Sequence, residues 1–202
     1  MIVTDIRELD KKRSKIYIDG EFAFVLYKGE IREYKIAVGE DIAQRIYDEV
    51  MTVVLPKRAK LRAMNLLQKK DYTEKQLRDK LSDGDYPQEL IDEAISYVRS
   101  FHYIDDERYA RDYITYHMSS RSKNRIIQDL ANKGIGKDIY QGILDELYQE
   151  DSDAEIEQIN KLLIKKHYDP DTTEFEDKQR IIAFLMRKGY SSSDIRRAME
   201  KS

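Results

Sequence analysis

The sequence IDDERYA at residues 104–110, followed by RIIQDLANKGI at residues 125–135, decides the fold class. Two adjacent carboxylates, Asp105 and Asp106, stand where a helix is expected to begin. Acidic side chains in that position accept hydrogen bonds from free backbone N–H groups and oppose the helix dipole. The second segment places its apolar residues on one helical face: Ile126, Ile127 and Leu130. The stretch therefore predicts two helices joined by a turn at residues 119–122.

A glycine ends the second of these helices and leads into a third. The pair Lys133-Gly134 follows the periodic segment, which is typical of a helix C-terminus. A further helix is expected from about Lys137, with four residues facing inward: Ile139, Ile143, Leu144 and Leu147. We therefore predict a unit of three helices.

The same pattern occurs at two other places in the chain. The segment IIQDLANKG at residues 126–134 recurs as IIAFLMRKG at residues 181–189. A weaker copy lies upstream, where Leu77 and Leu81 match Ile126 and Leu130, and Leu90 and Ala94 match Ile139 and Ile143. Copies spaced by roughly fifty residues are typical of tandem helical repeats, in which neighbouring units help to bury each other's apolar faces.

Helix-start signals support the outer two copies. Residues 73–76 form a capping box, Pro87 suits a first helical turn, and a buried stripe follows: Leu90, Ile91, Ala94, Ile95 and Val98. In the last copy, capping boxes are expected at residues 152–155 and 173–176, with a loop at residues 168–171 between the helices. Its inward residues are Ile156, Ile159, Leu162 and Leu163, and then Ile195, Ala198 and Met199 in a helix from about Ser192.

The first forty residues have strand character. Apolar and polar residues alternate from Ile2, and two further apolar runs flank Asp19-Gly20, a strong signal for a type I′ hairpin turn. A helical turn at residues 30–34 and a helix ending near Val54 are expected next. Because proline interrupts helices, we expect Pro56 to end this segment.

The sequence thus predicts a mainly α protein with three tandem three-helix, helix-turn-helix-like repeats forming an elongated, curved array behind a small extension that contains a β-hairpin. The predicted segments are residues 1–56 for the N-terminal extension with its following helix, 57–104 for the first repeat, 105–151 for the second and 152–202 for the third.

Composition narrows the class of protein. The 202 residues contain no Cys, which excludes disulfides and thiolate metal sites. No stretch approaches the ~18 apolar residues of a membrane-spanning helix, and residues 1–5 lack a signal-peptide core. We therefore expect a cytoplasmic protein that does not bind membranes. Charged residues make up 37% of the chain but nearly balance at a net charge of −3, so nucleic-acid binding would depend on local patches.

Signals for catalysis are weak, and we expect neither enzymatic activity nor a cofactor. The three histidines, His102, His117 and His167, lack the spacing of metal ligands. The segment GIGK at residues 134–137 has Ala131 where a phosphate-binding loop needs its first glycine, so it is interpreted as a helix end and a helix start. Asp105 and Asp106 more simply cap a helix than act as a general acid/base or metal pair.

Two basic clusters are the better candidates for a binding site. The first comprises Lys57, Arg58, Lys60, Arg62, Lys69 and Lys70, and the second comprises Arg121, Lys123, Arg125, Lys133 and Lys137. Both are interpreted as lacking balancing acids nearby, and such residues can contact phosphates or acidic protein surfaces. The alternative is a solvated charged face without a partner. Tyr109 and Tyr113 are interpreted as core residues rather than base-stacking residues.

The residues from YIDD at 103–106 to KGI at 133–135 resemble the central repeat of the RecX regulatory proteins. Residues 63–67 and 72–77 are similar to the first repeat of that family, and the resemblance extends over about residues 57–200. The N-terminal extension also resembles that of Gram-positive members. Two positions depart from the family pattern: Ser122 stands near a usual glycine, and Gln76 replaces a usual glutamate.

The resemblance implies a non-enzymatic negative regulator that binds RecA recombinase–DNA filaments and inhibits their extension, ATPase, recombination and coprotease activities. The implied partners are the RecA filament and, more weakly, single- or double-stranded DNA. The repeat array would lie along the filament groove, with the basic clusters contacting RecA or DNA phosphates. Because no dimerising heptad is evident, we expect a monomer.

Two other functions remain open from the sequence. A helix-turn-helix transcription factor would bind duplex DNA sequence-specifically, usually as a dimer. An enzyme would require an activity that is lost when Asp105 is replaced by Asn.

Overall fold

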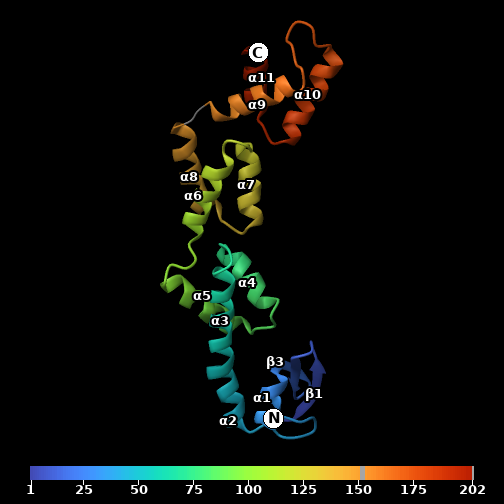
Figure 1. Cartoon of the computed structure of the whole chain (residues 1–202), viewed down its shortest axis with the longest axis vertical. Coiled ribbons are helices and arrows are strands. Elements are labelled where there is room, and N and C mark those ends of the chain that lie inside the picture. Colours follow the sequence, from blue (N-terminus) through green and yellow to red (C-terminus); the bar gives the residue numbers. More distant parts are fainter. Residues whose placement is uncertain (151–152, 202) are drawn as a thin grey trace. The chain divides into compact units, whose positions relative to one another are not determined.

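The computed structural model describes residues 1–150 and 153–201 (Figure 1). The chain divides into two compact units, Met1–Ile104 and Asp105–Ser202. Most described residues are helical, and the strands are confined to the N-terminal part of the first unit. Within the described ranges, no helix is long and apolar enough to cross a membrane.

The first unit begins with a three-stranded antiparallel sheet in the order β1-β2-β3, made of β1 (Val3–Glu8), β2 (Arg13–Ile18) and β3 (Glu21–Tyr27). At the β2–β3 turn, Asp19 has a φ of 51° and Gly20 a φ of 90°, so the predicted type I′ turn is confirmed. Alternation along the strands buries one face of the sheet, including Ile16, Phe24 and Leu26. A sheet this small is stable only when that face is covered.

A long helical segment covers the sheet. The chain first forms the short helix α1 (Lys28–Glu33). The long segment begins at Gln44 and runs continuously through α2 (Gln44–Glu49), the π-helical turn η1 (Val50–Val54) and α3 (Leu55–Leu67). The expectation that Pro56 ends a helix is therefore wrong. The N–H of Leu55 donates to the carbonyl of Val50, so the backbone is widened immediately before the proline. We attribute the tolerance of Pro56 to this wide turn, which relieves the usual clash of the ring with the preceding turn.

The first three-helix domain combines α3 with α4 (Glu74–Ser82) and α5 (Gln88–Ser100). The capping box is confirmed, because Thr73 accepts a hydrogen bond from the N–H of Gln76. All five residues of the predicted stripe on α5 are buried. Leu90 from this stripe belongs to the core beneath the sheet, which joins the sheet to the domain. An ion pair between Lys15 on β2 and Asp85 in the α4–α5 turn adds a second connection.

The second unit contains two further three-helix domains. The first consists of α6 (Asp106–His117), α7 (Lys123–Asn132) and α8 (Lys137–Glu150). The second consists of α9 (Ala154–Lys165), α10 (Phe175–Arg187) and α11 (Ser192–Lys201). Each domain has its own apolar core, built around Ile126 and Leu130 in one and around Ile181 and Leu185 in the other. Gly134 and Gly189 have φ values of 83° and 92°, which confirms the predicted helix ends.

Two predicted caps of the last domain differ from the structure or cannot be compared with it. The capping box at residues 173–176 is wrong, because Glu174 is the N-cap of α10. Thr173 instead accepts a hydrogen bond from the N–H of Asp169, since the loop is folded around the Asp169 side chain. Ser152, the predicted cap of α9, lies outside the described residues, as does the predicted boundary between residues 151 and 152.

Candidate functional site

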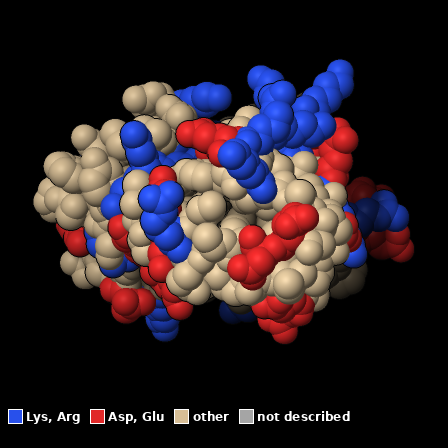
Figure 2. Space-filling view, turned by 90° about the horizontal axis from the view of Figure 1, so that it is seen from below, with Lys and Arg blue, Asp and Glu red and all other residues tan. Residues whose placement is uncertain are grey.

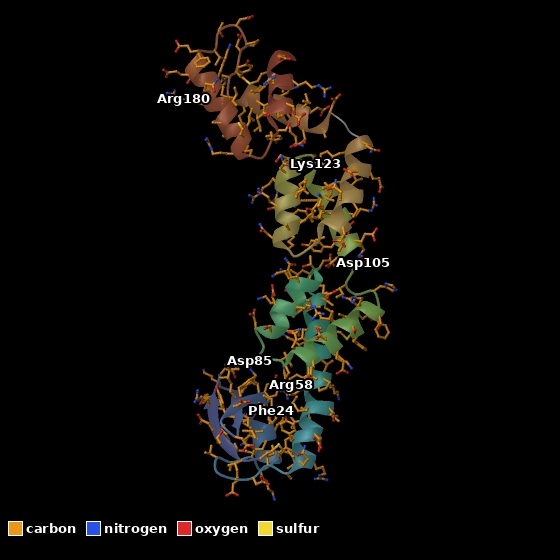
Figure 3. The ribbon with its side chains drawn as sticks, turned by 180° about the vertical axis from the view of Figure 1, so that it is seen from behind. Phe24, Arg58, Asp85, Asp105, Lys123 and Arg180 are labelled. Atoms are coloured by element: carbon orange, nitrogen blue, oxygen red, sulfur yellow. The ribbon has the colours of Figure 1, made fainter. Side chains whose placement is uncertain are left out.

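Arg58, from the first basic cluster, connects the sheet to α3. Its guanidinium forms an ion pair with Glu30 and donates a hydrogen bond of 3.1 Å to the carbonyl of Val25. It also lies 4.6 Å from the centre of the Tyr27 ring. Figure 3 shows Arg58 between the helix and the sheet, close to Phe24. A guanidinium with all these intramolecular partners stabilises the fold and is poorly placed to meet another molecule.

Lys60 also has a partner within the first unit. Its ammonium lies 2.7 Å from a carboxylate oxygen of Glu93 on α5 and 5.4 Å from the ring centre of Tyr97. The premise that the first cluster lacks balancing acids is therefore wrong for Arg58 and Lys60. Glu30 and Glu93 are distant in sequence, so only the tertiary structure brings these carboxylates to the cluster.

The other four residues of the first cluster are exposed: Lys57, Arg62, Lys69 and Lys70. Within the described part of the chain, none of the four forms an ion pair, although Lys70 lies 4.6 Å from the ring centre of Tyr72. They project from α3 and from the turn that follows it. These four cations are available to an external phosphate or carboxylate, whereas Arg58 and Lys60 are already engaged.

Two arginines of the second cluster share one carboxylate, that of Asp129 on α7. Arg121 lies 2.7 Å from it and also donates to the Tyr113 hydroxyl, and Arg125 lies 3.2 Å from its other oxygen. Asp129 is only 11% exposed, so the pair with Arg121 offsets the cost of burying its charge. The premise that this cluster lacks balancing acids is also wrong.

Tyr113 packs on the domain core, as predicted, and burial raises the pKa of its phenol.

The remaining cations of the second cluster differ in their surroundings. Lys123 lies 3.6 Å from Asp145 and 5.1 Å from the ring centre of Tyr148. Lys133 lies over Tyr113, with its ammonium 5.1 Å from the ring centre. Lys137 lies at the start of α8 and has no ion pair among the described residues. Figure 2 shows the general pattern on one face of the molecule, where Lys and Arg are interspersed with Asp and Glu.

A polar joint between the two domains of the second unit was not predicted. The hydroxyl of Ser122, the N-cap of α7, donates to the carbonyl of Lys188 at 2.7 Å. The side-chain amide of Asn124 donates to the carbonyl of Gly189 at 3.0 Å. These two carbonyls lie at the end of α10, where helix carbonyls have no partner in their own helix. The start of α7 therefore binds the C-terminal end of α10.

The same joint contains a buried glutamine. Gln158 on α9 donates to the carbonyl of Met118 at 2.6 Å and accepts from the Tyr190 hydroxyl at 2.9 Å. Burial, together with the nearby Glu155 carboxylate, raises the pKa of Tyr190 to about 12. Burial also raises the pKa of Glu155, whose carboxylate accepts from the N–H of Lys123 at 2.9 Å. No local sequence signal identifies this network, because its members come from segments that are distant in the sequence.

The residues considered for catalysis have structural roles. Asp105 accepts a hydrogen bond of 2.9 Å from the N–H of Arg108 and is the N-cap of α6, as interpreted from the sequence. Gly134 ends α7, so the segment at residues 134–137 is a helix end followed by a helix start. Within residues 1–150 and 153–201, no group of three His, Cys, Asp or Glu side chains is arranged to hold a metal ion.

Comparison with known proteins identifies all three domains. Family models match residues 59–97 as the first three-helix domain of RecX, residues 105–142 as the second and residues 153–199 as the third. Regulatory protein RecX from Caldanaerobacter subterraneus subsp. tengcongensis is 30% identical, over 98% of this chain and 98% of its own length. The chain belongs to the RecX family of regulatory proteins.

Other RecX proteins agree with this assignment. Regulatory protein RecX from Finegoldia magna is 30% identical, over 95% of each chain. A crystal structure of regulatory protein RecX matches 98% of both chains with a TM-score of 0.67 at 24% identity. The crystal structure of RecX from Lactobacillus salivarius matches 73% of this chain and 96% of its own, with a TM-score of 0.65 at 24% identity. At this identity the two structures support the fold, including the tandem three-helix domains predicted from the sequence.

Proposed function

We propose that this chain is a non-enzymatic negative regulator of the RecA recombinase, which binds RecA filaments on DNA and inhibits their extension, ATPase, recombination and coprotease activities. Its membership of the RecX family over nearly the whole chain is the observation that supports this function. We further propose that it acts as a monomer in the cytoplasm and needs no cofactor. Inhibition of filament growth requires no catalytic residue, because a protein bound to the filament can block the addition of RecA subunits by occupying the position where the next subunit would bind.

The exposed cations of the first cluster are the best candidates for contacts with the filament. Lys57, Arg62, Lys69 and Lys70 project from one helix and its following turn without an internal ion pair in the described structure. Lys137 is a further candidate. Cations of this kind bind phosphates of DNA or carboxylates of a protein. We assign Arg58 and Arg121 primarily to the fold, because their guanidinium groups already bind carboxylates inside the molecule.

The test is RecA ATP hydrolysis on single-stranded DNA with this protein added at substoichiometric amounts. Binding to the same DNA without RecA is measured in parallel by fluorescence anisotropy. We expect inhibition at concentrations well below those that coat free DNA. Absence of inhibition, or inhibition that follows DNA coverage, would contradict the function and favour a plain nucleic-acid-binding protein. Sequence-specific binding to duplex DNA would instead support the transcription-factor alternative.

Charge-reversal variants test the proposed contacts. Lys57→Glu combined with Arg62→Glu is expected to weaken inhibition by about tenfold or more, in line with the loss of charge pairs at an interface. Lys161→Glu combined with Arg196→Glu is the matched control, because both residues are exposed and lie outside the two basic clusters. This pair changes the net charge by the same amount. Equal effects of the two pairs would show that net charge, and not the first cluster, determines inhibition.

A further inference from the structure

Three aromatic side chains form a row at the C-terminal end of α5 in the first unit. The ring centres of Tyr97 and Phe101 lie 5.0 Å apart. Those of Phe101 and Tyr103 lie 5.7 Å apart, with ring planes 17° from parallel. Tyr97 packs against the core of the domain, whereas Phe101 is 54% exposed and Tyr103 is 46% exposed. The row therefore begins at the core and ends in two rings that solvent reaches.

A small apolar hollow lies where this row meets α3. The helices α3 and α5 lie side by side (Figure 1). The hollow has a volume of ≈ 220 Å³ and is lined by Met64, Leu67, Gln68 and Tyr103. The side-chain amide of Gln68 forms no hydrogen bond with another described residue, so its donors and acceptor are free. Because Tyr103 belongs both to the row and to the hollow, a flat ring bound there would lie beside the aromatic row.

The hollow continues along one face of α3. At 100° per residue, Lys57, Leu61, Met64 and Gln68 lie on the same side of this helix. Leu61 is 52% exposed, and Lys57 is exposed without an ion pair among the described residues. This face is roughly 16 Å long, since each helical residue adds 1.5 Å. The surface is therefore larger than the hollow and includes a free ammonium group.

The unpaired charge beside the hollow is positive. Lys69 and Lys70 follow α3 directly; both are exposed, and neither forms an ion pair within the described part of the chain. Asp71 comes after them and carries one negative charge. The other nearby carboxylate, Glu93, lies one helical turn before the aromatic row and is paired with Lys60 at 2.7 Å. The surplus of cations favours an anionic ligand.

Single-stranded nucleic acid matches both properties of this surface. Its unpaired bases offer flat faces that stack on aromatic side chains, and its phosphates bind lysine ammonium groups. The free amide of Gln68 can form hydrogen bonds with the edge of such a base. In a duplex the bases are stacked on one another and only their edges are accessible in the grooves. An acidic peptide would match the lysines, but its carboxylates would gain nothing from the aromatic row.

We propose that the row of Phe101 and Tyr103, with the adjoining hollow and face of α3, is a binding site for single-stranded nucleic acid. A base occupies the hollow beside Tyr103, and the phosphates lie at Lys57, Lys69 and Lys70. Resting on the proposed function, we identify the strand as DNA. The site needs no RecA to bind it, so this inference can fail while RecA inhibition stands, and the reverse.

The test is binding of a fluorescently labelled dT 20-mer to the full chain without RecA, followed by anisotropy. Phe101→Leu combined with Tyr103→Leu keeps both positions apolar but removes the ring faces. We expect the Kd to rise by about tenfold or more, the effect of losing base stacking. Phe101→Tyr combined with Tyr103→Phe keeps both rings and should stay within about twofold of the unmodified chain. Far-UV circular dichroism should be unchanged in both variants, because the two side chains are largely exposed.

The matched control removes one Tyr ring and one Phe ring elsewhere. Tyr116 and Phe175 are 78% and 74% exposed in the second unit. Tyr116→Leu combined with Phe175→Leu should leave the Kd for the dT 20-mer within about twofold of the unmodified chain. A 20-bp duplex is expected to bind more weakly than the single strand, with a Kd that the leucine pair at residues 101 and 103 does not change.

The salt dependence separates stacking from charge. Each phosphate contact with a single strand contributes about 0.7 to the slope of log K against log salt concentration. Lys69→Gln combined with Lys70→Gln should therefore reduce the slope by about 1.4. The leucine pair should leave the slope unchanged, because it removes no charge.

Four results would overturn the inference. The unmodified chain does not bind the dT 20-mer, or the leucine pair binds it as tightly as the unmodified chain does. The leucine pair weakens duplex binding equally, which would indicate a contact with the DNA backbone in place of base stacking. A rU 20-mer binds more tightly than the dT 20-mer, which would identify the strand as RNA. Loss of RecA inhibition by the leucine pair with dT binding intact would identify a protein-binding surface instead.

Discussion

Replacement of Gly189 by alanine should break the joint between the two domains of the second unit. Gly189 has a φ of +92°, a conformation that L-residues with a side chain rarely adopt. A Cβ atom at this position would also lie 2.6 Å from the Ser122 hydroxyl oxygen. That hydroxyl donates to the carbonyl of Lys188, so it cannot move away without breaking a hydrogen bond.

The expected cost has two separate parts. The positive φ contributes about 1 kcal/mol for alanine relative to glycine. The clash with the Ser122 hydroxyl contributes about 1–1.5 kcal/mol through the lost hydrogen bond to Lys188. We therefore expect Gly189→Ala to lower the free energy of unfolding of the second unit by about 2–2.5 kcal/mol.

A double-mutant cycle with Ser122→Ala separates these parts. Ser122→Ala alone costs about 1–2 kcal/mol, because it removes both the N-cap of α7 and the bond to Lys188. In that background the hydroxyl no longer obstructs a Cβ atom, so Gly189→Ala should cost only the ~1 kcal/mol of backbone strain. The expected coupling between the two positions is thus about 1–1.5 kcal/mol.

Urea unfolding followed by far-UV circular dichroism measures these free energies, since the chain contains no Trp for fluorescence. Amide hydrogen exchange on peptides from each unit assigns the loss of stability to the second unit. Gly20→Ala is the control for strain alone, because Gly20 has a φ of +90° and a Cβ atom added there would meet no other atom within 4 Å. The same cost for Gly189→Ala with and without the Ser122 hydroxyl would refute the clash.

Three further predictions concern stability, each measured by urea unfolding of the full chain. Arg58→Gln should destabilise the first unit by about 1–3 kcal/mol, because Glu30 loses its partner, whereas the exposed Arg62→Gln should stay within about 0.5 kcal/mol. The pKa of Tyr190 is raised from 10.0 to about 12, so the folded state retains the proton longer and the second unit should lose stability between about pH 10 and pH 12. Tyr190→Phe should reduce this dependence without removing it, because the pKa values of Tyr113 and Tyr168 are raised as well. Burial raises the pKa of Glu155, so Glu155→Gln should stabilise this unit at pH 7 relative to the unmodified chain, and the gain should disappear below the ordinary carboxyl pKa of 4.5.

The candidate site was only partly predictable. Counting charges along the sequence identified Lys57, Arg62, Lys69 and Lys70, which the structure leaves exposed. It could not exclude Arg58, because the pairing carboxylate comes from a helix turn far away in sequence. Their contacts with a partner stay a prediction, as do the predicted segment boundaries.

Local and periodic features of the fold were determined by the sequence alone. Helix caps, tight turns and helix ends depend on residues within a few positions of each other, whose backbone preferences act locally. This applies to the caps at Thr73 and Asp105, to the Asp19-Gly20 turn, and to the helix ends at Gly134 and Gly189. The repeated spacing of apolar residues then specified three helical domains, because each periodic face needs to be buried.

Only the tertiary structure decided how polar groups from distant segments are paired. The long helix passes Pro56 because a π-helical turn widens the backbone, a feature without a propensity signal in the sequence. The joint of Ser122, Gln158 and Tyr190 depends on hydrogen bonds that are short and directional, so it forms only where packing brings donor and acceptor atoms of separate segments within about 3 Å of each other. Periodicity determines which faces are buried, but distance and orientation between elements determine which donors meet which acceptors.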